Sequence, residues 1–212
     1  MVQCLDQSGL RAAVCALKQR DTQLAVIADQ YGPPPMWRRP QTLATLVQVV
    51  LEQQVSLKSA KAIFERVKTQ LGSITPLGLQ RLGEGGLRHL GVTRQKSRYI
   101  VGLADEIATG KLSLNRLRFR TDSEVRDELT ALVGIGEWTA NVYLLMALRR
   151  PDIWPRGDLA LLIATGEVCL NGNRPAPEYA EEYAARWSPY RSVAARMLWH
   201  WYLNQTRQRA KA

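Results

Sequence analysis

The sequence predicts an all-α protein of two helical lobes, and three observations support this prediction. Apolar residues recur at helical spacing through most of the 212 residues. No series of segments alternates apolar and polar residues as strands would. The segment GPPPMWRRP (residues 32–40) contains three consecutive prolines, which remove hydrogen-bond donors and fix an extended path. This segment is therefore expected to be a rigid connector between the lobes.

Composition and charge narrow the class of protein. With 46% hydrophobic residues, the chain can bury a substantial core as one domain or as two small lobes. Lysine and arginine outnumber acidic residues 29 to 19, and the net charge of +10 is spread along the chain. This balance favours a polyanionic partner, most often nucleic acid. A basic enzyme whose charge only aids solubility explains it equally well.

The cysteines and the start of the chain indicate the compartment. Cys4, Cys15 and Cys169 are too scattered for a zinc ribbon or an iron–sulfur cluster, so we expect buried thiols in a reducing cytoplasm. The first residues lack the order of a signal peptide, and no apolar run is long enough to span a bilayer. We expect a soluble cytoplasmic protein, associated with the nucleoid if it is bacterial.

The first half of the chain is expected to be helical in three stretches. They are one element over residues 6–32, two helical patterns over 42–72 and two shorter helices over 74–112. The patterns of the second stretch meet at EQQVS, where Gln53 and Gln54 are either solvated or presented at a surface cleft. Trp37, in the connector, is interpreted as a packing anchor in preference to a ligand contact.

Arg94, Lys96 and Arg98 cluster at the start of the second of the two shorter helices. Basic residues at a helix start oppose the helix dipole. An external anion therefore explains this cluster better than helix stability does, while a solvated face remains the alternative for each residue.

The second half of the chain carries clear helix boundaries. Thr121 and Glu124 form a capping box, which predicts a helix from about Asp122 to Gly134. After the next helix, the proline-broken loop RRPDIWPRG leads to Asp158, which precedes the apolar run LALLIATGEVCL. The last long helix is expected within SPYRSVAARMLWHWYLNQ, followed by TRQRAKA as a frayed basic tail.

Two features of this half suggest chemistry. In VGIGEW, Gly134 and Gly136 can adopt positive φ, and the following helix start exposes backbone N–H groups, so the turn can cradle an anion. The motif alone is weak, because Gly134 also suits a helix C-cap. Asp158 is a good N-cap. Near a flipped nucleotide its carboxylate would also stabilise positive charge on a sugar as the bond to its base breaks, and the two roles are compatible.

Two segments together closely resemble the helix-hairpin-helix, glycine-proline-aspartate signature of the DNA glycosylase superfamily. They are LVGIGEWTANVYLLMAL and PRGDLAL. The chain looks most like the 3-methyladenine DNA glycosylase II group, which removes alkylated purines. Two further segments are similar to that group, namely LEQQVSLKSAKAIFERV at its early helical junction and WSPYRSVAARMLWHWY at its closing helix. The resemblance covers roughly residues 37–203. It implies a DNA and base cleft between a central lobe of about 42–150, which includes the hairpin, and a second lobe from 1–41 plus 151–212. The 40 residues before the central lobe leave no room for the N-terminal β domain of some members, so the compact form is expected.

The resemblance also implies roles for individual residues. Asp158 matches the catalytic aspartate, and Trp138 and Trp199 match aromatic positions of the base pocket. The residues that match the hairpin holding the DNA backbone are Gly134, Ile135, Gly136 and Thr139. Members that cut the DNA strand carry a lysine where this chain has Trp138, because an amine is needed to form a Schiff base. We therefore expect a monofunctional hydrolase without lyase activity.

Further residues are given structural or less specific roles. Gln53 or Gln54 would fill the gap left by a flipped base, where some relatives have a bulky apolar residue. An indole face attracts a purine made cationic by alkylation, which fits an aromatic pocket. Trp201 and Tyr202 are expected in the core of the last helix, and the histidines in packing or at the surface.

The function that follows is hydrolysis of the N-glycosidic bond of alkylated purines, of the 3-methyladenine or 7-methylguanine type, in duplex DNA. The product is an abasic site that initiates base excision repair. No redox cofactor or catalytic metal is expected, although the resemblance allows a monovalent cation at the hairpin. The expected partner is duplex DNA containing damaged bases, with no membrane, and the protein is expected to be a monomer. The rival functions are a glycosylase for deaminated or oxidised bases and a noncatalytic helix-hairpin-helix DNA-binding module.

Overall fold

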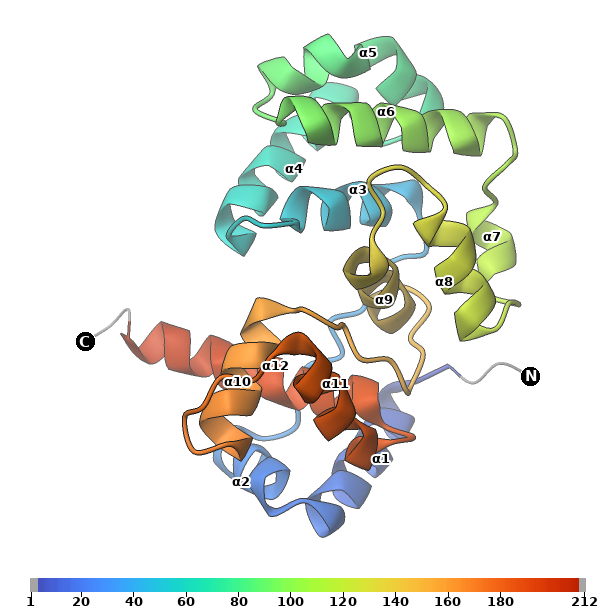
Figure 1. Cartoon of the computed structure of the whole chain (residues 1–212). Helices are drawn as coiled ribbons and strands as arrows, with labels where there is room; N and C mark the ends of the chain where they lie inside the picture. The colour runs from blue at the N-terminus through green and yellow to red at the C-terminus, as the bar shows by residue number, and fades with distance from the viewer. Residues whose placement is uncertain (1–3, 210–212) are drawn as a thin grey trace. The chain divides into compact units, whose positions relative to one another are not determined.

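The computed structural model describes residues 4–209, and every regular element in this range is a helix (Figure 1). The helices are α1 (Gln7–Arg20), α2 (Thr22–Tyr31), α3 (Leu43–Glu52), α4 (Leu57–Leu71), α5 (Pro76–His89), α6 (Arg94–Ala108), α7 (Leu114–Leu117), α8 (Asp122–Thr130), α9 (Glu137–Met146), α10 (Leu159–Cys169), α11 (Pro177–Ala184), the 3₁₀ turn η1 (Ala185–Trp187) and α12 (Arg191–Arg209). The predicted all-α class is confirmed for this part of the chain.

The chain divides into two compact units. The first, here called the central unit, runs from Arg39 to Tyr143. The second, here called the terminal unit, combines the segment up to Arg38 with the segment from Leu144 onward. The central lobe was expected to continue to residue 150, but the residues after Tyr143 belong to the terminal unit. Several hydrogen bonds hold them there; for example, Leu5 N donates to Arg149 O at 2.7 Å, and Arg196 donates to Leu145 O at 3.0 Å.

The core of the central unit is centred on α3. Its apolar residues Leu46, Val47, Val49 and Val50 are fully buried. The helix packs against α4 and α6, and α5 and α6 lie side by side (Figure 1). The sequence LATLVQVVLE is apolar almost throughout, as expected for a helix that has neighbours on most of its sides.

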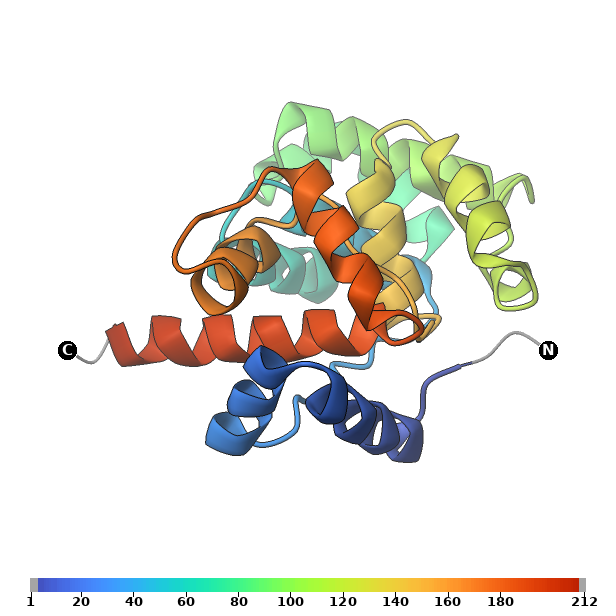
Figure 2. The ribbon, with the colours of Figure 1, turned by 60° about the horizontal axis from the view of Figure 1, so that its bottom comes forward.

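The core of the terminal unit is centred on α12. This helix lies across α1 and α2 and also packs against α10 (Figure 2). All residues from Ser192 to Trp199 are buried, so this stretch has no solvent-facing stripe. The predicted frayed tail from Thr206 is wrong over its first part, because α12 continues through Arg209. Residues 210–212 lie outside the described residues.

The element predicted over residues 6–32 is two helices, separated at Asp21. This residue has extended backbone angles and accepts a hydrogen bond from Leu24 N, so it is the N-cap of α2. Its other carboxylate oxygen accepts a hydrogen bond of 2.7 Å from the Trp187 indole, far along the chain. Asp21 therefore combines a local helix cap with a tertiary contact, and helical periodicity alone reveals neither.

The prediction of three buried thiols is wrong for two of them. Cys4 and Cys15 are exposed. Cys169 is partly buried, and burial raises the pKa of its thiol to about 12. Among the described helices, none is long and apolar enough to cross a membrane.

Candidate functional site

The turn between α8 and α9 forms the first part of the candidate site. The Thr121–Glu124 capping box is present, as predicted, and starts α8. The helix ends at Thr130, four residues before the predicted end, because the chain turns back and Ile135 N donates to Leu132 O at 3.1 Å. Gly134 is thus part of the hairpin turn, and the alternative interpretation as a helix C-cap is wrong.

The two hairpin glycines differ in what surrounds them. Gly134 has φ of +89°, and a Cβ there would lie 2.1 Å from the Tyr99 ring. Gly136 lacks positive φ, and a Cβ there would meet nothing within 4 Å. Internal packing therefore does not require Gly136, whose bare surface lies next to the start of α9. The first N–H groups of any helix have no intrahelical acceptor, so this surface can receive an anion.

Gln53 holds the hairpin in place. Its Nε2 donates to Gly134 O and to Thr139 Oγ1, both at 2.9 Å. Thr139 is 1% exposed and Ile135 is 4% exposed, so both side chains are buried. These values cover the backbone as well as the side chain, so of the residues matched to the hairpin only Gly134 and Gly136 are accessible at the surface.

Lys96 supports the neighbouring junction between α3 and α4. Its Nζ donates to Leu51 O at 2.9 Å and to Gln53 O at 2.7 Å. These carbonyls belong to the C-terminal end of α3, where a cation is favoured. Partial burial lowers the pKa of Lys96. An external anion is thus not needed to explain this lysine, whereas Arg94 and Arg98 of the same predicted cluster are exposed.

The EQQVS segment breaks the helix where predicted, between Glu52 and Leu57. Gln54 is exposed and has φ of +54°, a left-handed conformation that is unfavourable for a side chain of this kind. Gln53 is half-buried with its amide bound to the hairpin. The two glutamines thus differ, and Gln54 is the one with an exposed side chain.

Asp158 forms the second part of the candidate site, in the terminal unit. It is the N-cap of α10, as predicted, and accepts a hydrogen bond of 3.0 Å from Leu161 N. The same oxygen, Oδ1, accepts a hydrogen bond of 3.0 Å from the indole Nε1 of Trp199. The structure thus brings together two of the predicted site residues, from α10 and α12.

Aromatic residues of the terminal unit support this pair. The ring of Trp37 meets that of Trp199 edge to face, with centroids 6.5 Å apart, so its predicted packing role is confirmed. His200 Nε2 lies 3.1 Å from Tyr31 O, which is also a packing contact. Trp201 and Tyr202, predicted to be in the core, are only partly buried.

Trp138 lies on α9 in the central unit and is half-buried. His89, at the end of α5, is exposed.

The loop that precedes Asp158 is anchored by Asp152. Its carboxylate accepts hydrogen bonds from Arg191 N at 3.0 Å, from the Arg191 guanidinium at 2.9 Å and from Ser188 Oγ at 2.9 Å. Burial acts to raise the pKa of Asp152, but the hydrogen bonds and the charge of Arg191 outweigh it and hold the pKa below its usual value. The loop is thereby fixed to the start of α12, the helix that carries Trp199.

Sequence reasoning missed Tyr99 of the site, and it gave Gln53 another role, that of filling the gap left by a flipped base. Tyr99 packs against Gly134, and Gln53 binds the hairpin carbonyl. Neither has a local signal, because both contacts join segments far apart in sequence. Over the described residues, no group of three His, Cys, Asp or Glu side chains is placed to hold a metal ion.

Comparison with known proteins gives consistent similarities. The family model described as "HhH-GPD superfamily base excision DNA repair protein" matches residues 47–189. A DNA-3-methyladenine glycosidase from Bacillus halodurans, known from a crystal structure, is 30% identical with a TM-score of 0.72 over 91% of this chain and 88% of that chain. DNA-3-methyladenine glycosylase 1 of Schizosaccharomyces pombe is 25% identical over 181 residues, which are 84% of this chain and 79% of the relative. Two longer relatives, from Bacillus subtilis and Mycobacterium tuberculosis, are matched over 65% and 36% of their length.

Proposed function

The chain belongs to the HhH-GPD superfamily of base excision DNA repair proteins, and we propose that it is a DNA glycosylase for alkylated purines in duplex DNA. It would hydrolyse the N-glycosidic bond of bases of the 3-methyladenine or 7-methylguanine type and leave an abasic site. The observation that carries this proposal is the Asp158 carboxylate, held by hydrogen bonds from Leu161 N and Trp199 Nε1. The names of the relatives support the same substrate class.

Asp158 supplies the negative charge that the reaction needs. As the bond to the base breaks, positive charge develops on the sugar, and a fixed carboxylate stabilises it. The two N–H donors orient Oδ1 before the substrate arrives, so little reorganisation is required in the transition state. A base that alkylation has made cationic is already a good leaving group, so no strong general acid is needed.

The proposed reaction is monofunctional, with water attacking the sugar. Trp138 stands where strand-cutting members of the superfamily carry a lysine, and an indole has no amine to form a Schiff base. Trp138 and Trp199 would instead line the base pocket, where an indole face attracts a cationic purine.

We assign DNA gap filling to Gln54. Its exposed position and left-handed backbone support this choice, while the amide of Gln53 is engaged by the hairpin. The hairpin turn, with Gly134 and Gly136, would bind the DNA backbone through N–H groups. A monovalent cation there would use backbone carbonyls of the turn.

The proposal is tested by base release from a panel of duplexes, each with one defined lesion. We expect release from duplexes with alkylated purines, and none from those with deaminated or oxidised bases. Preferential release of the latter would favour a different glycosylase, and no release from any duplex would favour a noncatalytic DNA-binding module. Borohydride should trap no covalent adduct, since a trapped adduct would contradict the monofunctional reaction.

A further inference from the structure

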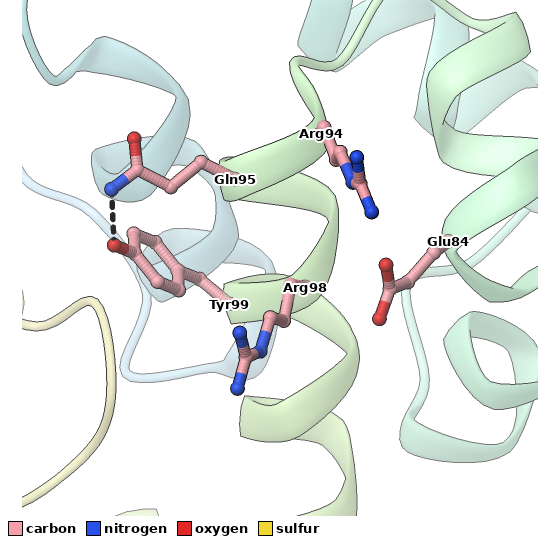
Figure 3. A pocket seen from close by; sticks show the side chains of 5 residues that line it. All are labelled: Glu84, Arg94, Gln95, Arg98 and Tyr99. Atoms are coloured by element: carbon pink, nitrogen blue, oxygen red, sulfur yellow. Dashed lines mark hydrogen bonds between the residues drawn. The ribbon is translucent and has the colours of Figure 1, made fainter.

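The central unit has a pocket of ≈ 640 Å³ beside the hairpin (Figure 3). Its lining residues are Glu84 from α5 and Arg94, Gln95, Arg98 and Tyr99 from the first half of α6. Four of the five therefore come from two successive turns of one helix.

Two exposed arginines dominate the charge of this pocket. Arg94 and Arg98 are four residues apart in α6, a spacing that places them on the same face of the helix. Over the described residues, neither guanidinium forms an ion pair within 4.0 Å or a hydrogen bond, although Glu84 also lines the pocket (Figure 3). Arg94 is also the first residue of α6, where the helix dipole disfavours a cation. Two guanidinium groups are thus left available for an anion.

The pocket is continuous with the hairpin through Tyr99. The Tyr99 ring lies directly against Gly134, close enough to exclude a Cβ there. Gln95 donates a hydrogen bond to the Tyr99 hydroxyl (Figure 3). Lys96, also on α6, donates a hydrogen bond to the Gln53 carbonyl, and the Gln53 side chain donates one to the Gly134 carbonyl. The start of α6 is therefore fixed to the hairpin, with its two free guanidinium groups on the adjoining surface.

We propose that this pocket is a second phosphate-binding site, in which Arg94 and Arg98 bind the sugar-phosphate backbone of the DNA held by the hairpin. This inference rests on the proposed function, because it takes duplex DNA as the ligand. Charge complementarity with the DNA backbone supports this proposal. The hairpin offers N–H groups without side-chain charge, and the pocket adds two positively charged, planar guanidinium groups that suit phosphate oxygens. Glu84 is the opposing charge, which weakens attraction of the polyanion.

The test measures equilibrium binding of a short duplex carrying a tetrahydrofuran abasic analogue, at salt concentrations from 50 to 200 mM. The logarithm of the binding constant falls linearly with the logarithm of salt concentration, with a slope of about −0.9 per phosphate contact. Losing two contacts in Arg94→Gln/Arg98→Gln should therefore make the slope shallower by about 1.8. The loss of affinity should then be about tenfold greater at 50 mM than at 200 mM. Glu84→Gln should tighten binding. Circular dichroism establishes that each variant is folded.

The control is Arg11→Gln/Lys68→Gln, which removes two positive charges from exposed residues outside the pocket. It should leave the salt slope near that of the wild type. A wild-type slope in the folded Arg94/Arg98 variant, or no change in Glu84→Gln, would overturn the phosphate site. A wild-type protein that neither binds the duplex nor releases bases would instead overturn the proposed function, so the two failures are distinguishable.

Discussion

At the residue scale, the site depends on the pair formed by Asp158 and Trp199. The indole donates to the carboxylate oxygen that also caps α10, so helix capping and carboxylate orientation use the same atom. The cap alone would hold Asp158 at the helix start. The second donor comes from a different helix and fixes the carboxylate relative to the core of the terminal unit.

Replacing Trp199 by Phe should therefore slow base release while leaving DNA affinity almost unchanged. A hydrogen bond to a charged group contributes about 1.5–3 kcal/mol, which corresponds to a loss of roughly 10- to 100-fold in the single-turnover rate. Phe retains a ring for stacking. The matched control is Trp201→Phe, two residues along the same helix, which should release bases at the wild-type rate. Equal rates for the two variants would contradict a positioning role for Trp199.

Tyr143 gives a prediction about stability. Its hydroxyl is buried and has no hydrogen-bond partner among the described residues, and burial raises its pKa. A buried polar group without a partner is unfavourable. Tyr143→Phe should thus leave the free energy of unfolding unchanged or raise it by up to about 1 kcal/mol, measured in urea. A loss of stability would show that the hydroxyl forms a stabilising interaction.

At the scale of elements, local signals in the sequence predict the helix starts well. The capping box at Thr121 and Glu124 and the N-cap at Asp158 depend on residues within one turn, and both are confirmed. The ends are less predictable. The split at Asp21 interrupts a single pattern of apolar periodicity, and α8 ends at Thr130 because the hairpin already begins there.

The candidate site shows the same difference between features set by nearby residues and contacts made by distant ones. The glycine turn and the aspartate are visible in the sequence, because turn chemistry and capping act locally. The contacts that hold them are not, since Tyr99, Gln53 and Trp199 reach them from other elements. The position of Arg94, Lys96 and Arg98 at one helix start likewise suggested a single basic cluster, whereas Lys96 turns inward to carbonyl groups and the two arginines are exposed.

The α3–α4 junction predicts opposite effects for its two glutamines. Gln53→Ala removes two hydrogen bonds to the hairpin and should lower the free energy of unfolding by about 1–3 kcal/mol. Gln54→Gly relieves a left-handed conformation and should leave stability equal or slightly higher. Urea denaturation measures both. If Gln54 fills the DNA gap, Gln54→Gly should still release bases more slowly than the wild type, and an unchanged rate would count against that role.

The loop before Asp158 gives a prediction about pH. The pKa of Asp152 is lower in the folded protein than its ordinary value of 3.8, so its stabilising contribution is complete above that value and is lost as pH falls through the folded pKa. Asp152→Asn should cost about 1 kcal/mol at pH 7, allowing for the partial exposure of the ion pair. The difference from the wild type should disappear in strong acid. A difference that persists there, in denaturation at several pH values, would show that the carboxylate charge is not responsible.

At the scale of the whole molecule, the residues proposed for DNA binding and for catalysis belong to different units. The hairpin and the two pocket arginines are in the central unit, whereas Asp158 and Trp199 are in the terminal unit. DNA affinity and base release should consequently respond to different substitutions. Variants of the pocket arginines should change the salt dependence of binding, and variants of the Asp158–Trp199 pair should change the rate of the chemical step.

The most direct measurement of the central claim is single-turnover release of an alkylated purine from duplex DNA by the wild type and by Asp158→Asn, alongside salt-dependent binding of the same duplex. We predict that the variant binds with the affinity and salt slope of the wild type but releases the base at least about 100-fold more slowly, since a charge placed for the transition state is lost. Base release by Asp158→Asn at the wild-type rate would contradict the account.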